Sequence, residues 1–282
     1  MLSLDLGPLA LGVPQAILLG SLLLAVAVGW WLGRAQGINP EGRLFALLVV
    51  AVVIARLVFV LAYAEEYESA PWQVLDIRDG GFVPWPGILA ALVLAGWWLW
   101  RRPRLRRPLG AGLTIGLAAW VGASYLWHTS ESDNRLPPLV LHDAQGVPVE
   151  LEDHLGKPLV INLWATWCPP CRREMPVLAE FQRRAPEVTF LFVNEGEPPQ
   201  TVQAYLAKEG LALENLLLDA DSQLGQAVGS HALPTTLFYD ADGRRLGVHL
   251  GEFSRASLAA TLLSLDMLER LPTGDAAIVD RP

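Results

Sequence analysis

The sequence predicts an all-α transmembrane bundle of four spans followed by a separate α/β domain. The first half carries four long apolar runs, whereas the second half alternates short apolar runs with helical patterns and turns. Of the 282 residues, 52% are hydrophobic. The mean hydropathy is positive, which disfavours a single soluble domain. The two cysteines of the chain lie in the second half, directly after one of its apolar runs, and indicate a candidate site there.

Each apolar run of the first half approaches the roughly 20 residues that a helix needs to cross a bilayer. The four runs cover residues 11–33, 44–63, 84–100 and 109–127. Arginines crowd the loops after the first and third runs, and cytoplasmic loops retain such residues. The acidic loop between the second and third runs and the N-terminus then face outward. This arrangement predicts a four-pass protein of a bacterial inner membrane, with everything after Trp127 in the periplasm.

The second domain begins after a short polar linker at residues 128–138 and is predicted to extend over residues 139–271. Residues 272–282 are predicted to be a disordered tail. Strands are predicted at residues 139–142, 147–151, 159–163, 188–193, 215–218, 235–239 and 246–249. Helices are predicted at residues 170–184, 199–209, 222–228 and 256–271.

The cysteine pair lies where a predicted buried strand turns into a predicted helix. At a helix start, unpaired backbone N–H groups and the helix dipole lower the pKa of a cysteine in a Cys-X-X-Cys pair, from about 8.5 to as low as about 3.5. Cys168 is therefore predicted to be the attacking thiolate. Cys171, one helical turn later, can reach back and release the mixed disulfide. Pro169 and Pro170 between them suit a first helical turn, where a missing N–H costs nothing.

Two other interpretations of the pair are half of a zinc site and a structural disulfide. Zinc would need two more ligands, and the sequence has neither a second cysteine pair nor a close histidine pair to supply them. Binding of copper by the reduced pair, as in a copper chaperone, stays an alternative. Otherwise no metal and no cofactor is predicted beyond the redox-active disulfide itself.

Residues around this pair carry a family resemblance that covers residues 139–265. The segment from Trp164 to Glu174, together with Pro234 in the run from Ala232 to Phe238, resembles the thioredoxin fold. Specifically, it is similar to the membrane-tethered periplasmic thiol-disulfide reductases of the TlpA, ResA and CcmG type. Asn162 stands where thioredoxin itself has a buried Asp, which favours this branch. The resemblance implies a thioredoxin-like domain with a helix-strand insertion at residues 199–228.

The resemblance also implies roles for individual residues. Pro234 is expected to be cis and to shape substrate docking, and Glu174, six positions after the first cysteine, is expected to handle protons. Pro176 falls where thioredoxins kink the active-site helix. Substrate docking is expected to involve residues on both sides of the pair, namely Trp167, Pro169, Pro170, Leu233 and Thr235.

The membrane part carries a second, weaker resemblance. Residues 55–59 and 79–87 look like a fragment of the prolipoprotein diacylglyceryl transferase core, whose intramembrane arginine falls on Arg56. That family has a histidine where this chain has Trp85, and it has about three further spans. A lipoprotein acyltransferase is therefore the least favoured function. A charge inside a span usually marks a site. Arg56 is expected to extend to the membrane surface, to pair with Glu65, Glu66 or Asp79, or to contact a lipid or a partner protein.

Electron flow and partners follow from what lies between and around the cysteines. Oxidants of the DsbA kind place a histidine between them, whereas here both residues are prolines, which favours a reductase of protein disulfides. Cytochrome c maturation and metalloprotein assembly are the expected settings; a thiol oxidase or isomerase is the alternative.

The four spans contain no cysteine, so a separate transmembrane donor of the DsbD or CcdA kind is expected. Residues 129–282 hold 12 basic and 22 acidic side chains, which argues against nucleic acid.

Overall fold

The computed structural model describes residues 3–6, 9–34, 37, 39–67, 71–130 and 135–268. The chain separates into two compact units. The helical unit comprises residues 11–68 and 81–132, and the α/β unit comprises residues 1–10, 69–80 and 133–282. The predicted tail at residues 272–282 and part of the predicted linker lie outside the described residues.

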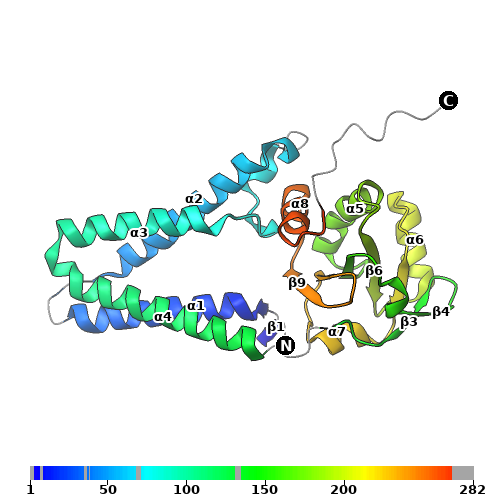
Figure 1. Ribbon diagram of the computed structural model, residues 1–282, viewed down its shortest axis with the longest axis horizontal. Helices are drawn as coiled ribbons and strands as arrows, with labels where there is room; N and C mark the ends of the chain where they lie inside the picture. Colours follow the sequence, from blue (N-terminus) through cyan, green and yellow to red (C-terminus); the bar gives the residue numbers. More distant parts are fainter. Residues whose placement is uncertain are drawn as a thin grey trace. The chain divides into compact units, whose positions relative to one another are not determined.

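The helical unit contains four helices at the positions of the four predicted apolar runs (Figure 1). They are α1 (Val13–Arg34), α2 (Glu41–Ala62), α3 (Pro84–Arg101) and α4 (Arg106–Ser130). Within the described residues, three segments are long and apolar enough to cross a membrane, namely Val13–Arg34, Glu41–Ala62 and Pro103–Trp127. Helix α3 is not among them; it has 18 residues, and its prolines and tryptophans contribute little hydropathy. The structure therefore confirms a helical region with three candidate spans, and the fourth span stays a prediction.

Helix α1 packs along α4, and α2 packs along α3. Small residues allow the first pair to approach closely: a Cβ atom added to Gly112 or Gly116 of α4 would lie 2.7 Å from an atom of Ala25 in α1. Such close backbone approach is how helices associate in lipid, where apolar side chains gain little from leaving the solvent. These glycines therefore hold α4 against α1 at a separation that larger side chains would prevent.

Short elements complete the connections. Strands β1 (Ser3–Leu6) and β2 (Leu9–Gly12) form a two-stranded sheet. Between α2 and α3 lie the 3-10 helices η1 (Ala64–Tyr67), η2 (Pro71–Leu75) and η3 (Ile77–Asp79), and η4 (Pro103–Leu105) precedes α4.

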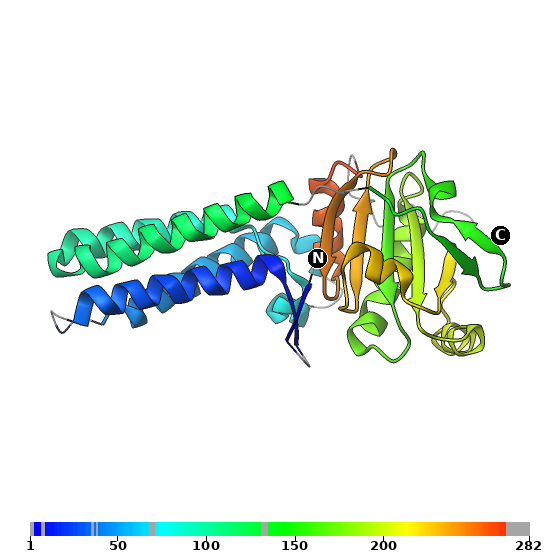
Figure 2. The same ribbon diagram turned by 90° about the horizontal axis from the view of Figure 1, so that it is seen from below.

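The α/β unit is built on a seven-stranded sheet in the order β4-β3-β7-β6-β5-β8-β9 (Figure 2). Its strands are β3 (Val140–Asp143), β4 (Pro148–Glu150), β5 (Leu159–Trp164), β6 (Thr189–Glu195), β7 (Leu216–Asp219), β8 (Thr235–Tyr239) and β9 (Arg245–Leu250). Its helices are η5 (Leu151–His154), α5 (Pro169–Arg184), α6 (Pro199–Glu209), α7 (Gln223–Val228) and α8 (Arg255–Ser264). The strands and helices predicted from the sequence are all present, with shifted ends. Whether residues 199–228 are an insertion relative to thioredoxin stays a prediction.

Strand β5 is the centre of the sheet, because it pairs parallel to β6 on one side and antiparallel to β8 on the other. All six of its residues are buried, and all but Asn162 are apolar, so the strand does not alternate between apolar and polar residues. Val160 and Trp164 pack with α5, α6 and α8 on one face. Leu159, Ile161 and Leu163 pack with α7 on the other. The carboxyl end of β5 therefore leads directly into the cysteine pair from a rigid position between two apolar layers.

The prediction of a closing helix at residues 256–271 is wrong at its end, since α8 stops at Ser264. Asp266 adopts a positive φ of 54°, and the N–H of Met267 donates to the carbonyl oxygen of Leu262. This six-to-one hydrogen bond is a common end of a helix in which the residue after the C-cap adopts the left-handed conformation. The apolar residues beyond it, Met267 and Leu268, fold back onto the core instead of continuing the helix.

Candidate redox active site

Cys168 is the N-cap residue of α5, and Pro169 and Pro170 occupy the first two helical positions. The N–H of Cys171 donates to the sulfur of Cys168 at 3.3 Å. A side chain at this position accepts from the free N–H groups of the first turn, and the positive end of the helix dipole lies behind it. This geometry would stabilise negative charge on the sulfur of Cys168, and its role as the attacking thiolate stays a prediction.

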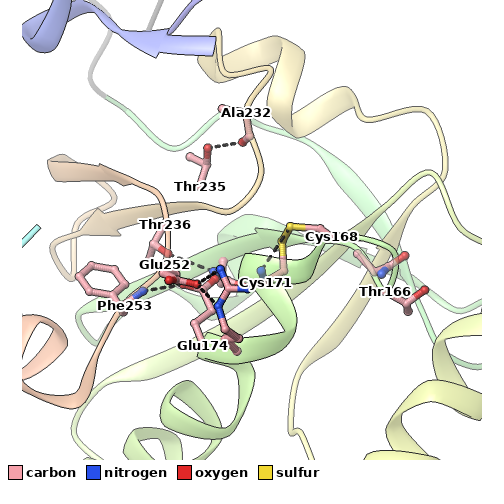
Figure 3. Close-up of a disulfide and its surroundings, with 12 residues drawn as sticks. Thr166, Cys168, Cys171, Glu174, Ala232, Thr235, Thr236, Glu252 and Phe253 are labelled. Carbon is pink, nitrogen blue, oxygen red and sulfur yellow. Dashed lines mark hydrogen bonds and ion pairs between the residues drawn. A yellow bond between two sulfur atoms is a disulfide. The ribbon is translucent and has the colours of Figure 1, made fainter. Parts of the chain in front are cut away.

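The two cysteines form a disulfide with an S–S distance of 2.04 Å and a Cα–Cα distance of 5.3 Å (Figure 3). Cys171 is fully buried, whereas Cys168 keeps 3% exposure. Trp167, directly before the pair, is 68% exposed, and Pro169 is also exposed. A partner protein approaching the pair would therefore meet Trp167 and Pro169 first and Cys168 before Cys171.

Glu174 lies one helical turn after Cys171 and is fully buried. One of its oxygens accepts a hydrogen bond from the amide of Asn162 at 2.8 Å, and the other accepts from the backbone N–H of Phe253 at 3.0 Å. The same Asn162 amide also donates to the hydroxyl of Thr236 at 3.0 Å. Figure 3 shows this carboxyl beneath Cys171, enclosed by Thr236 and Phe253. The sequence thus predicted an acid near the cysteines, and the structure shows its carboxyl group held by two other segments, strand β5 and the loop before α8.

Burial raises the pKa of Glu174 to about 8, because a charged carboxylate loses its hydration inside the protein. The nearby carboxylate of Glu252 raises it further, whereas the hydrogen bonds from Asn162 and Phe253 lower it. A carboxyl group with this pKa can both bind and release a proton near neutral pH. It is therefore suited to proton transfer beside the cysteine pair.

The peptide bond between Leu233 and Pro234 is cis. Leu233 is half-buried, and Pro234 is buried. Thr235 is fully buried; its hydroxyl donates to the carbonyl of Ala232 at 2.6 Å and lies 2.7 Å from the hydroxyl of Ser230. The hydroxyl of Thr235 is therefore hydrogen-bonded inside the loop before β8. Its side chain is not available to a docked partner, and Thr235 would affect docking through the conformation of this loop.

Sequence reasoning missed Glu197. This residue follows β6 and is only 9% exposed, and its carboxylate binds the turn that leads to Cys168 through the N–H and hydroxyl of Thr166. A signal was present: the polar run from Asn194 to Glu197 follows an apolar strand that is the parallel neighbour of β5. The carboxyl ends of neighbouring parallel strands meet at one edge of a sheet, so this run had to lie near the cysteines.

Two more acids have interactions that the sequence does not predict, although one of them, Glu195, lies in the polar run just described. Glu252 pairs with Arg173 at 2.6 Å, and its carboxylate also lies 3.6 Å from Arg78. Glu195 lies at the end of β6 beside Asp219; burial and that neighbour raise its pKa to about 7. Their partners are far away in the sequence, so only the folded chain brings these charges together.

Arg56, the predicted membrane-embedded charge, belongs to the helical unit and is 7% exposed. It donates to the carbonyl oxygen of Gly81 at 2.8 Å. Its guanidinium lies 5.7 to 5.8 Å from the ring centres of Phe59, Tyr67 and Phe82. Aromatic faces attract a desolvated cation, so this cage lowers the cost of a charge inside a helical bundle. The predicted pairing with Glu65, Glu66 or Asp79 stays a prediction.

In the part of the chain that the structure describes, no group of three or more His, Cys, Asp or Glu side chains is arranged to hold a metal ion.

Comparison with known proteins identifies the α/β unit. The family model described as Redoxin matches residues 131–263. The thiol-disulfide oxidoreductase ResA of Geobacillus thermodenitrificans is 34% identical over 133 residues, which are 46% of this chain and 75% of that protein. This chain belongs to the ResA family of thiol-disulfide oxidoreductases. The ResA protein of Bacillus subtilis is 30% identical over 149 residues, 52% of this chain and 80% of its own length.

Two further matches accompany this ResA-family oxidoreductase. The family model described as prolipoprotein diacylglyceryl transferase matches residues 5–121, so the helical part resembles that membrane enzyme as predicted. A solved structure of MTB dsbF in mixed oxidised and reduced forms has a TM-score of 0.43 and 29% sequence identity, over 45% of this chain and 95% of that one. The relatives and the two family models together show a thiol-disulfide oxidoreductase whose helical region is similar to prolipoprotein diacylglyceryl transferase.

Proposed function

We propose that this ResA-family oxidoreductase reduces disulfides of other proteins outside the cytoplasm. The observation that carries the proposal is the buried Glu174 carboxyl one helical turn from Cys171, with its pKa raised to about 8. Reduction of a substrate disulfide requires two thiols of the enzyme to lose their protons. An acid that is poised near neutral pH beside the second thiol can accept its proton and later return it.

The proposed reaction has two exchange steps. The thiolate of Cys168 attacks one sulfur of the substrate disulfide, so that a mixed disulfide forms and the other substrate sulfur leaves as a thiolate, which takes up a proton. Cys171 then gives its proton to Glu174 and attacks Cys168, which releases the second substrate thiolate and forms the Cys168–Cys171 disulfide. Glu174 returns its proton as that thiolate is protonated. Two electrons and two protons have passed to the substrate.

The direction of electron flow is supported by the residues around Cys168. Proline at positions 169 and 170 brings no positive charge to stabilise a thiolate. When Glu174 is ionised, its negative charge beside Cys171 opposes a second negative charge on the cysteines. Both effects disfavour the thiolate form, and a reduced form that is less stabilised gives up its electrons more readily.

A redox titration of the purified protein against glutathione or dithiothreitol buffers tests the direction. We expect a reduction potential near the roughly −270 mV of thioredoxin. A potential near about −120 mV, typical of the oxidant DsbA, would instead support a thiol oxidase. The Glu174→Gln variant, titrated in parallel, should have a less negative potential if the buried acid contributes to the reducing character.

We further propose that the helical part anchors the redox domain on the periplasmic side of a bacterial inner membrane. Arginines in the loops around residues 34–43 and 101–107 support this orientation. Since the described candidate spans carry no cysteine, electrons would come from a separate membrane donor of the DsbD or CcdA kind. Apocytochrome c and metalloprotein-assembly factors with disulfides are the proposed substrates.

Labelling of single introduced cysteines tests the orientation. In a background where Cys168 and Cys171 are serine, Asp242→Cys places a thiol in an exposed turn of the α/β unit, and Arg104→Cys places one in an exposed loop of the helical unit. In cells with a permeable outer membrane, a membrane-impermeant maleimide should label the first variant. It should label the second only after the inner membrane is disrupted. The opposite pattern would exclude a periplasmic redox domain.

A further inference from the structure

The carboxylate of Glu197 makes three hydrogen bonds with both of its oxygens. Oε2 accepts from the backbone N–H of Thr166 at 2.6 Å and from the side-chain amide of Asn194 at 2.9 Å. Oε1 accepts from the hydroxyl of Thr166 at 2.5 Å. Asn194 is fully buried and lies on β6, so it fixes the carboxylate relative to the sheet. The Glu197 carboxylate is therefore fixed by Asn194 of the sheet, and it accepts two hydrogen bonds from Thr166.

Thr166 lies inside the turn that delivers Cys168 to the start of α5. The N–H of Cys168 donates to the carbonyl of Ala165 at 3.2 Å, which closes this turn. Trp164 and Ala165 at its beginning are fully buried in the core. Thr166 itself is half-buried, and the following Trp167 is 68% exposed. Figure 3 shows Thr166 on the chain just before Cys168. Its backbone N–H and its hydroxyl both donate to the carboxylate of Glu197, which ties this turn to the loop after β6.

We propose that Glu197 is a positioning residue for Cys168. It reaches from the β6–α6 loop to hold the Thr166 turn, and this sets the place of the Cys168 sulfur relative to the N–H groups of α5 and to an incoming disulfide. The role concerns any thiol-disulfide exchange at Cys168, so it holds whether the protein reduces or oxidises its partners. A small misplacement of a reacting atom is costly, because exchange needs the attacking sulfur in line with the disulfide that it attacks.

Variants of Glu197 separate its hydrogen bonds from its charge. In Glu197→Gln, the amide oxygen can accept from Thr166 N–H and Asn194, and the amide N–H group can donate to the Thr166 hydroxyl oxygen. All three contacts survive without the negative charge. In Glu197→Ala, all three are lost. Thr166→Ala removes only the hydroxyl contact, and Thr166→Ser retains both contacts of that residue.

The experiment measures how fast Cys168 reacts in the full-length protein in detergent. In the Cys171→Ser background Cys168 is the single thiol, and its rate constants with a small aromatic disulfide and with iodoacetamide are measured from pH 5 to pH 10. We expect Glu197→Ala to slow the disulfide reaction about tenfold or more and to change the apparent thiol pKa from the pH profile. Glu197→Gln should stay within about threefold of the parent, as should Thr166→Ser, and Thr166→Ala should lie between.

A matched control is Glu209→Ala. Glu209 also contacts α5, through an exposed ion pair with Arg172 at 3.3 Å, and such surface pairs contribute little. In the Glu209→Ala variant, the rate constant of Cys168 with the aromatic disulfide should equal that of the parent. If Glu197→Ala does not fold, which circular dichroism would reveal, Thr166→Ala decides by its slower reaction. The proposal is overturned if the alanine variants react like the parent, or if Glu197→Gln is as slow as Glu197→Ala. The redox titration above tests the direction of electron flow separately.

Discussion

Replacing Cys168 with serine is expected to lower the rate of thiol-disulfide exchange by at least about a thousandfold, because serine does not ionise near neutral pH and cannot act as the attacking thiolate. The variant loses the sulfur at the N-cap of α5, where the N–H of Cys171 and the helix dipole stabilise negative charge. The measurement is reduction of a protein disulfide by the dithiol form of the enzyme, with the parent protein alongside. A rate within tenfold of the parent would exclude Cys168 as the nucleophile.

Cys171→Ser should behave differently, because the first attack survives and the release step is lost. We expect this variant to accumulate mixed disulfides between Cys168 and its substrates, which are visible on non-reducing gels of membranes and are identified by mass spectrometry. The double serine variant, in which neither sulfur remains, is the control and should capture nothing. If Cys168→Ser captured proteins and Cys171→Ser did not, the assigned roles would be reversed. The identities of the captured proteins would also show which class of protein is the substrate.

Replacing Glu174 with glutamine is expected to slow turnover about a hundredfold, since a positioned acid or base contributes roughly 10² to 10⁴ to proton transfer. Glutamine preserves the size of the side chain and an acceptor oxygen for Asn162 or Phe253, but it cannot take a proton from Cys171. In the parent, turnover should rise with pH as Glu174 loses its proton around pH 8, and this rise should be absent in the variant. An unchanged rate and pH profile would exclude proton transfer through Glu174.

The same substitution should change how stability depends on pH. The pKa of Glu174 is about 8 in the folded protein and near 4.5 when unfolded, so the folded state favours the neutral form. The contribution of neutral Glu174 to the free energy of unfolding is fully present below about pH 4.5 and is lost as the pH rises through 8. The total loss is at most about 5 kcal/mol. The Tm of Glu174→Gln relative to that of the parent should therefore increase as the pH rises from 5 to 9, by about 5 °C or more in total. Glu187→Gln, at an exposed carboxylate, should show no such gain.

The elements that the sequence predicted well are those whose signals are local. Strand β5 followed from a mostly apolar run at residues 159–163, and the start of α5 followed from two prolines after a cysteine, which suit a first helical turn. The hairpin of β3 and β4 followed from a turn at Gly146, whose φ of 83° suits glycine. The end of α8 was missed because apolar periodicity continues past Ser264. The left-handed residue that ends the helix is Asp266, and not a glycine, which would have been a sequence signal for a helix end.

The candidate site divides in the same way. A spacing of two residues between cysteines and one turn to Glu174 can be read along the chain, since residues three or four apart share a helix face. The groups that set the pKa of Glu174 are not local. Asn162 comes from a strand 12 residues earlier, and the N–H of Phe253 comes from a loop 79 residues later. The grip of Glu197 on Thr166 joins residues 31 apart.

The order of residues in the chain was thus enough to assign the chemistry, because a sulfur pair at a helix start is a local arrangement whose reactivity depends on neighbouring backbone groups. How deeply Glu174 is enclosed, and which acid holds the turn before Cys168, depended on the packing of β5 against β6 and β8. Burial and hydrogen bonding between distant segments exist only once the sheet has formed, since desolvation is a property of the surroundings and not of the residue.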